Sequence, residues 1–384
     1  MELSRRSMLR AGGLAAVLGT TGLAGCSGAL LGGGGRSPGD WQFDPGTHTD
    51  SANLFFGTAD YAGLYEHRTH LPASTSETLE TSSAVPLESA QIETVTGTGA
   101  VQFSSLDGSR TTFGSIVILG SFDRADAEQL VETQGNPEAS RQHRAFTLYE
   151  GVDGQEAGGL RGVPGGPTPF TMTAVAVGDG AMVVGASVVR GRNSGMVLAR
   201  DVAATTIDAA TGNAPRLQAR NRRARRLAEI LEDPTLAVGL QADPELLART
   251  QQAASGIQER LLAGLRGAGF GMTIDGASTT QTLVGFYEDD ETAAATEAVE
   301  LVDGMQVTQR EAVESVDATV DGDAVVVTVT GNTRGLLTDG LVPRPGDGPA
   351  GLSSRRDPSR RRHIHQPGAL WGVEDSTARS PGLE

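Results

Sequence analysis

The sequence predicts an α+β fold: two copies of a ββ-α-ββ unit that form antiparallel sheet, with the helices packed on one face and disordered segments at both ends. Two observations support this prediction. Apolar stretches flank Asp-Gly dipeptides, a strong short-range signal for a β-hairpin. The order hairpin, helix, hairpin also occurs twice along the chain, as expected for an internal duplication. The dipeptides are Asp107-Gly108, Asp179-Gly180, Asp275-Gly276 and Asp321-Gly322.

The first 25 residues predict a cleaved export signal. Arg5 and Arg6 lie in a short positive segment that precedes an uncharged, mostly apolar run from Ala11 to Thr21. This region is shorter than the roughly 20 residues that a membrane-spanning helix needs, and its glycines weaken it as a permanent helix. Paired arginines at this position are typical of a signal for the twin-arginine translocase, which carries folded proteins.

The sequence Leu23-Ala24-Gly25-Cys26 follows and contains the only cysteine of the chain. It resembles the processing site of lipoproteins, and the two motifs together resemble the exported lipoproteins of salt-loving archaea. This resemblance implies that Cys26 carries lipid and becomes the N-terminus after residues 1–25 are lost. The alternative is an uncleaved N-terminal helix with a buried cysteine. Since one acyl chain holds a protein only marginally, stable attachment needs two chains or a second contact.

Residues 26–52 are expected to form the lipid-bearing, Gly-rich tether, and residues 53–343 the α+β body. Leu54-Phe55-Phe56 is expected to enter the core. The stretch Thr69–Ser89 is rich in Ser and Thr and predicts a loop with one helical turn.

The first unit is predicted at about residues 95–212. Asp123 is a suitable N-cap for its helix, because Asp126 and Glu128 follow in the first turn. A second helix is predicted over Ser194–Thr211. The predicted strands are Val101–Ser104, Thr111–Phe122, His143–Glu150, Phe170–Val177 and Ala181–Val189.

The second unit is predicted at about residues 265–334, after two helices within residues 213–264. Those helices are expected over Arg216–Glu232 and Pro244–Leu265, and Asp243-Pro244 is a favourable helix start. Within the unit, an alanine-rich helix follows Asp289 or Asp290. The strands are expected at Phe270–Ile274, Thr280–Tyr287, Ser315–Val320 and Ala324–Val329. Residues 344–384, rich in Arg, Pro and Gly, are expected to be disordered.

The chain is strongly acidic: 47 acidic residues outnumber 31 basic ones, and all of the basic residues are arginine. A formal net charge of −16 disfavours nucleic-acid binding, which needs a basic face. High negative charge favours solubility, and its self-repulsion largely disappears at about 1 M salt, where the Debye length is about 3 Å. The composition therefore suits a halophilic protein, although a GC-rich genome also disfavours lysine.

No catalytic residue, cofactor or metal is assigned from the sequence. Absence of lysine excludes a phosphate-loop Gly-Lys-Ser/Thr motif, a Schiff base and a Ser-Lys dyad. One cysteine permits no internal disulfide, and no Gly-x-Ser-x-Gly sequence occurs. Histidines offer the remaining chemistry. Glu66, His67 and His70 could supply metal ligands from one helical face, but exposed loop histidines are the simpler interpretation. The others are His48, His143, and His363 and His365 in the tail.

An arginine cluster has two interpretations on this acidic chain. It could contact an anion or a lipid headgroup, as a second membrane anchor. It could instead be a solvated helix face whose charges pair with acids such as Glu229, Glu232 and Asp233. The members are Arg216, Arg220, Arg222, Arg223, Arg225 and Arg226.

These observations favour a binding or interaction module that lipid on Cys26 holds at the outer face of the cell membrane. Its ligand would be a protein or a small molecule, and not nucleic acid. The alternative is a surface-anchored hydrolase or metal-binding protein that uses the body histidines with Asp or Glu residues.

Overall fold

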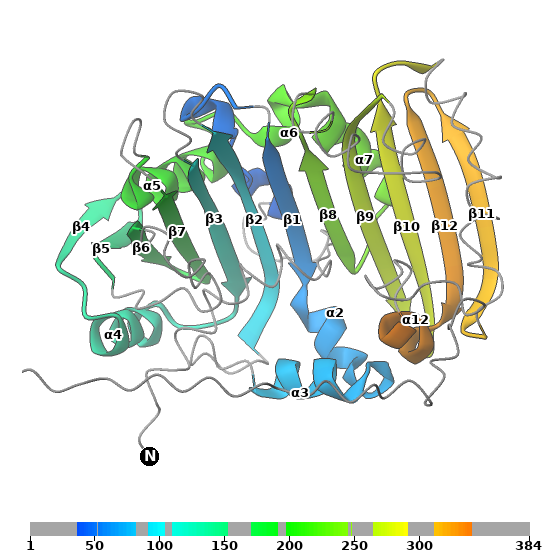
Figure 1. Ribbon diagram of the computed structural model, residues 1–384. Helices are drawn as coiled ribbons and strands as arrows, with labels where there is room; N and C mark the ends of the chain where they lie inside the picture. The colour runs from blue at the N-terminus through cyan, green and yellow to red at the C-terminus, as the bar shows by residue number, and fades with distance from the viewer. Residues whose placement is uncertain are drawn as a thin grey trace, which may run out of the picture. The chain divides into compact units, whose positions relative to one another are not determined.

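One antiparallel sheet of 12 strands organises the part of the chain that the structure describes (Figure 1). The computed structural model describes residues 37–51, 53–81, 91–103, 110–152, 170–190, 197–244, 247, 264–290 and 311–339. The strand order is β11-β12-β10-β9-β8-β1-β2-β3-β7-β6-β5-β4. Antiparallel sheet and helices together confirm the predicted α+β class.

In the N-terminal half, β1, β2 and β3 follow in order from the centre of the sheet, and the next four strands follow in reverse order, so that β7 lies next to β3 and β4 at the edge. Antiparallel partners face each other in regular register, for example Val117 opposite Val183 between β3 and β7. The seven strands are β1 Leu54–Asp60, β2 Ile92–Phe103, β3 Arg110–Gly120, β4 Ala139–His143, β5 Phe146–Glu150, β6 Phe170–Gly178 and β7 Ala181–Arg190.

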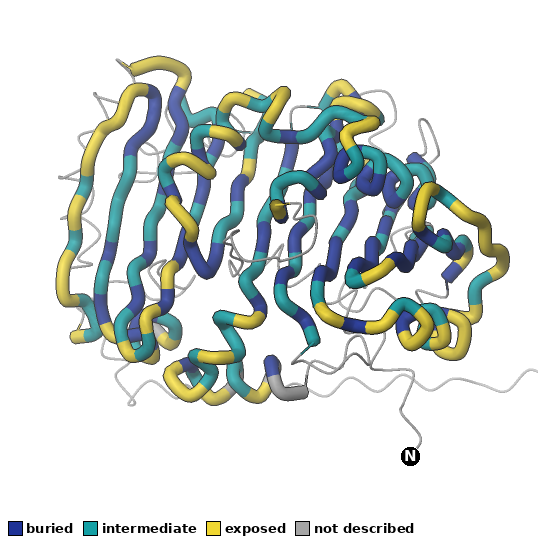
Figure 2. Tube along the Cα trace, turned by 180° about the vertical axis from the view of Figure 1, so that it is seen from behind, coloured by how far each residue is buried: buried dark blue, intermediate teal, exposed yellow. Residues whose placement is uncertain are grey.

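The C-terminal half uses a similar order, in which β12 lies next to β10 and β11 outside it. The halves join where β1 pairs with β8, so that Gly57 lies opposite Gly97 on one side and Val238 on the other. The outer strand β11 is largely exposed (Figure 2). The five strands are β8 Leu236–Gln241, β9 Leu265–Asp275, β10 Ser278–Tyr287, β11 Val313–Asp321 and β12 Ala324–Asn332.

Three of the four predicted Asp-Gly turns are present. Their glycines have φ values of +61° at Gly180, +59° at Gly276 and +58° at Gly322, a region where L side chains are strained. Asp107-Gly108 lies outside the described residues, between the paired strands β2 and β3. The dipeptides therefore correctly indicated where the chain reverses.

The helices agree with the prediction in part. Asp123 caps α4 by accepting a hydrogen bond from the amide of Ala125, as expected. The single helix predicted over 216–232 is instead broken at Asn221, whose side chain caps α7 by accepting from the amide of Ala224. The α-helices are α2 Tyr61–Glu66, α3 Ala73–Thr81, α4 Arg124–Gly135, α5 Ala199–Ala210, α6 Leu217–Arg220, α7 Arg222–Leu231 and α12 Thr333–Asp339.

Two short segments differ from the prediction. The stretch expected as a loop with one turn contains α3 and the 3-10 helix η3 (Arg68–His70). The strand expected to begin at His143 is instead β5, because Arg144 has a φ of 55° and turns the chain between β4 and β5. Most of the predicted helix over 244–265 falls outside the described residues, but its last residue, Leu265, begins the strand β9. The predicted helix beyond Asp290 and the tail of residues 344–384 also fall outside them.

Helices pack against both faces of the sheet, so the prediction of a single covered face is not confirmed. Successive strand residues point to opposite faces. On β6, Ala174 and Ala176 pack in a cluster with Ala203 and Ile207 of α5. The alternate residues of β6 pack in a different cluster with Val131 of α4. No helix among the described residues has the length and apolarity to cross a membrane.

The segment before β1 belongs to the folded body, which corrects the predicted extent of the tether over 26–52. Trp41 is 4% exposed and Phe43 is fully buried. The 3-10 helices η1 (Pro38–Trp41) and η2 (Pro45–Thr47) begin this segment. Between them, the side-chain amide of Gln42 donates to the hydroxyls of Thr58 at 2.9 Å and Thr96 at 3.2 Å. Burial of these side chains fixes the chain from Ser37 onward.

Candidate functional site

The residues predicted to direct export and anchoring lie outside the described part of the chain. These are Arg5, Arg6, Leu23, Ala24, Gly25 and Cys26, and the tail residues His363 and His365 also lie outside it. Their roles stay predictions from the sequence. The described residues hold two other candidates: the four body histidines and the arginine cluster.

His67 and His70 lie at the junction of two short helices. His67 is the C-cap of α2, and His70 ends η3, the next short helix. The carbonyl of His67 accepts a hydrogen bond from the amide of His70 at 2.9 Å. Within the described ranges, no group of three or more His, Cys, Asp or Glu side chains is arranged to hold a metal ion. The predicted metal alternative therefore gains no support from this part of the chain.

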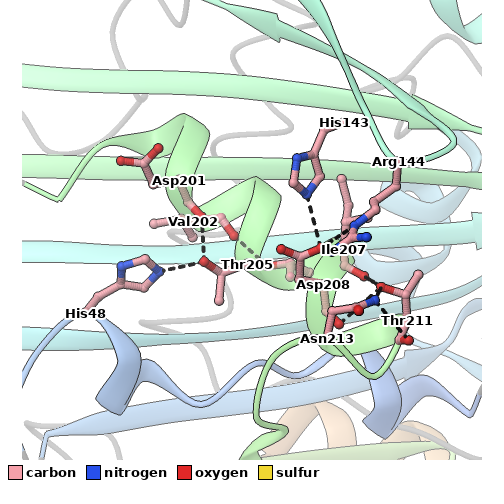
Figure 3. Close-up of polar contacts among 11 residues, drawn as sticks. His48, His143, Arg144, Asp201, Val202, Thr205, Ile207, Asp208, Thr211 and Asn213 are labelled. Carbon is pink, nitrogen blue, oxygen red and sulfur yellow. Dashed lines mark hydrogen bonds and ion pairs between the residues drawn. The ribbon is translucent and has the colours of Figure 1, made fainter.

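His48 joins the N-terminal segment to α5 (Figure 3). Its Nε2 lies 3.1 Å from the hydroxyl of Thr205, which in turn donates to the carbonyl of Asp201 at 2.8 Å. The imidazole also packs edge-on against the rings of Phe43 and Phe113, with centroids 5.8 and 5.7 Å away. Burial lowers the pKa of His48, and the nearby carboxylate of Asp201 opposes this effect only in part. The ring is thus suited to a structural role as a neutral group.

His143 contacts the same helix one turn further on (Figure 3). Its Nε2 lies 3.3 Å from Oδ1 of Asp208, and Nε of Arg144 donates to the same oxygen at 2.9 Å. His143 ends β4 and lies against α5 with 25% of its side chain exposed. The shared carboxylate fixes the β4–β5 turn on α5. The structure thus brings two of the four body histidines to α5 and leaves His67 and His70 at α2 and η3.

Most members of the arginine cluster have partners within the described residues. Arg216 pairs with Asp40, and Arg226 pairs with Asp321 and Glu229. Nη2 of Arg222 lies 3.5 Å from Oδ2 of Asp323. Nε of Arg225 donates to the carbonyl of Gln218 at 3.0 Å. For Arg216, Arg225 and Arg226, pairing within the protein is the better interpretation.

Arg223 differs from its neighbours. Its side chain is half-buried, its Nε is buried, and that nitrogen has no hydrogen-bond partner. Burial lowers the pKa of Arg223, the carboxylate of Asp323 raises it, and the like charges of Arg266 and Arg222 lower it further. Arg222 and Arg223 thus lie near the carboxylate of Asp323 where α7 begins beside β9, and Arg266 adds a third positive charge near Arg223. This cluster can attract an anion.

Sequence reasoning missed Asp208, Arg266 and Asp323. Asp208 is 65 residues from His143, and no local pattern connects the two. Arg266 on β9 and Asp323 in the β11–β12 turn come near α7 only through the sheet. The one available signal was the abundance of arginine at 222–226 in an acidic chain, which indicated the centre of the cluster and not its other members.

Comparisons with known proteins leave the family open. No protein-family model matches the chain, and no curated protein matches its sequence. Three solved structures of TP0453 align with much of the chain. Crystal form III has a TM-score of 0.40 and 14% identity over 77% of this chain and 96% of that chain. Form I has 0.37 and 13% over 77% and 96%, and form IV has 0.38 and 13% over 78% and 98%. These values are too low to support an inference about fold family or function.

Proposed function

We propose that the protein is a lipoprotein, exported by the twin-arginine route and held at the outer face of the cell membrane by lipid on Cys26, where its body binds a partner or ligand. The observation that carries this proposal is the order of Arg5-Arg6, an apolar run and Leu23-Ala24-Gly25-Cys26 at the start of the chain. Each part is placed as an export signal and lipid attachment require.

The position of the folded body supports the anchoring part of the proposal. The body begins near Ser37, because Trp41 and Phe43 are already buried in it. A chain spans at most about 3.6 Å per residue, so the path from Cys26 to Ser37 covers no more than about 40 Å. A lipid on Cys26 would therefore keep the body close to the membrane surface, and its partner would bind it there.

The topology agrees with export of a folded protein. The central pair, β1 and β8, joins Leu54–Asp60 to Leu236–Gln241, and Phe43 forms a bridge with Arg216. These contacts form only after most of the chain has been synthesised. A translocase that accepts folded proteins can carry the body after these contacts have formed.

Two sets of substitutions in the cells that make the protein test this proposal. Arg5→Lys with Arg6→Lys should leave the precursor inside the cell, whereas Arg10→Lys in the same positive segment should be exported normally. Cys26→Ser should move the body from the membrane fraction to the soluble extracytoplasmic fraction. Normal export of the double variant would overturn the twin-arginine assignment, and a membrane-bound Cys26→Ser protein would overturn lipid anchoring.

We further propose that the two halves of the sheet arose by internal duplication. The orders β1-β2-β3-β7-β6 and β8-β9-β10-β12-β11 correspond strand by strand, which supports the predicted repeat and extends each unit by its first strand. The hairpin β4–β5 has no counterpart in this alignment of the described strands. A rotation about one twofold axis between β1 and β8 should superpose the two sets of strands. If the best superposition instead matched β1 with β9, or β2 with β8, the duplication would be contradicted.

A further inference from the structure

We propose that Arg222, Arg223 and Arg266 form a binding site for a phosphate group beside Asp323. We call these three arginines the arginine triad. The inference goes beyond membrane anchoring and does not depend on it, because the site lies wholly within the described body. Phosphate could come from a lipid headgroup or from a soluble phosphate, and the test below distinguishes these sources.

The triad assembles residues from separate elements. Arg222 and Arg223 begin α7, whereas Arg266 lies on β9. The Cδ atom of Arg223 lies 3.6 Å from the position that a Cβ would occupy at Gly267, so its aliphatic stem lies close to the backbone directly after Arg266. Leu227 and Leu231 of the same helix pack tightly over Gly269 and Gly271 of β9. The packing of α7 on β9 therefore fixes Arg223 close to the strand that carries Arg266.

The carboxylates at this site do not neutralise the triad. Asp323 is largely buried, with 11% of its side chain exposed, and its contact to Arg222 is long at 3.5 Å. Glu288 accepts a hydrogen bond from Arg266 at 2.6 Å but is itself mostly exposed. No carboxylate within the described residues forms an ion pair with Arg223, and its Nε has no partner. Arg223 is thus a partly buried guanidinium that feels two like charges and the carboxylate of Asp323, but forms no direct ion pair with a described carboxylate.

A phosphate group supplies what the triad lacks. Guanidinium groups present planar pairs of donors that match phosphate oxygens, and such charge-assisted hydrogen bonds are among the stronger ones in proteins. A tetrahedral phosphate has enough oxygens to accept from more than one arginine at once. Arg222 is 79% exposed, which leaves the site open to a ligand from solvent. The charge of a bound anion would oppose both the burial and the like-charge repulsion that lower the pKa of Arg223.

The test uses the full-length chain with Cys26→Ser, so that no lipid is attached, in about 1 M NaCl to screen non-specific charge effects. Inorganic phosphate is titrated by calorimetry. Vesicles of neutral phospholipid, with and without phosphatidic acid, are titrated in a flotation assay. Arg223→Gln should weaken binding by about 10- to 100-fold, as expected for loss of a charged hydrogen bond. Arg225→Gln, in the same helix but hydrogen-bonded to Gln218, is the matched control and should bind normally.

The outcomes separate the sources of phosphate. Arg223-dependent binding of inorganic phosphate alone supports the site and a soluble ligand. Arg223-dependent binding to vesicles with phosphatidic acid supports the site and a lipid headgroup. No binding in either assay, or binding equal in Arg223→Gln and the parent, overturns the proposal. Arg266→Gln provides a second variant if Arg223→Gln does not fold, and circular dichroism of each variant establishes folding.

Discussion

His48 illustrates how single residues hold the N-terminal segment to the body. Its imidazole contacts two aromatic rings and one hydroxyl, and all three lie on different elements of the fold. Edge-on aromatic pairs and one hydrogen bond together contribute about 2 kcal/mol. The residue therefore stabilises the connection from which the anchor would extend.

We predict that His48 makes folding stability depend on pH. Burial holds the pKa of folded His48 below its usual value of 6.5, while in the unfolded chain the pKa returns to that value. As the pH falls below about 6.5, the unfolded state binds the proton first, so the free energy of unfolding decreases. Between about pH 7.5 and 5.5, the free energy of unfolding measured with denaturant should fall more for the parent than for His48→Gln.

Exposed His70 provides the control for this effect. His70→Gln should keep the pH dependence of the parent. If His48→Gln also keeps it, protonation of His48 does not govern stability in this range. Sequence patterns predicted a tether around His48 and could not reveal its partner, because Thr205 is 157 residues away.

At the scale of elements, α5 packs unusually close to the sheet. A Cβ added at Gly185 of β7 would lie 2.3 Å from the carbonyl oxygen of Ala199 and 2.9 Å from the amide nitrogen of Ala203. Both atoms belong to the backbone of α5, so neither can move without moving the helix. The absence of a side chain at this position permits the close contact.

Gly185→Ala should lower the free energy of unfolding by about 2 kcal/mol, because the added methyl group displaces backbone from a packed interface. Chemical denaturation measures the change. Gly39→Ala is the matched control, since its new Cβ would meet only the flexible end of Gln218 at 2.9 Å. It should change stability by less than about 0.5 kcal/mol. Equal changes in the free energy of unfolding for the two substitutions would show that the close contact with α5 does not make an added methyl group at Gly185 destabilising.

Elements with local signals were predictable, and elements without them were not. The apolar runs on either side of Asp179-Gly180 predicted β6 and β7, and Asp123 predicted the start of α4. By contrast, β8 has only six residues, of which two are buried, so its sequence shows weak alternation. Its pairing with β1 and β9, which defines the centre of the sheet, depends on contacts distant in the chain.

At the scale of the whole molecule, negative charge is the dominant property. A net charge of −16 causes self-repulsion, which salt screens as the Debye length falls from about 10 Å at 0.1 M to about 3 Å at 1 M. The outer strand β11 carries exposed acids at Glu314, Asp317 and Asp321. Charges on an edge strand also oppose pairing with another sheet.

The midpoint of thermal unfolding should therefore rise as NaCl increases from about 0.1 to 1 M. The variant Glu314→Gln with Asp317→Asn should show a smaller rise, because it removes two of the exposed charges. This comparison separates charge screening from the general effect of salt on hydrophobic burial. A midpoint that falls with salt, or an unchanged slope in the variant, would contradict a charge-based account.

The organisation of the whole chain was only partly predictable. Composition and motifs predict a compartment, but the number of strands in one sheet depends on how distant segments pair. The arginine triad shows the same limit, because Arg222 and Arg223 were visible as a cluster while Arg266 joined them only through the fold. Binding surfaces built from several elements have no signature in a single stretch of sequence.

The intact mass of the mature protein, purified from the membranes of the cells that make it, tests the central claim most directly. We predict a chain that lacks residues 1–25 and begins at Cys26, with additional mass that alkaline hydrolysis or lipid extraction of the N-terminal peptide identifies as lipid. A chain that retains Met1 or the apolar run, with an unmodified Cys26, would contradict the lipoprotein assignment.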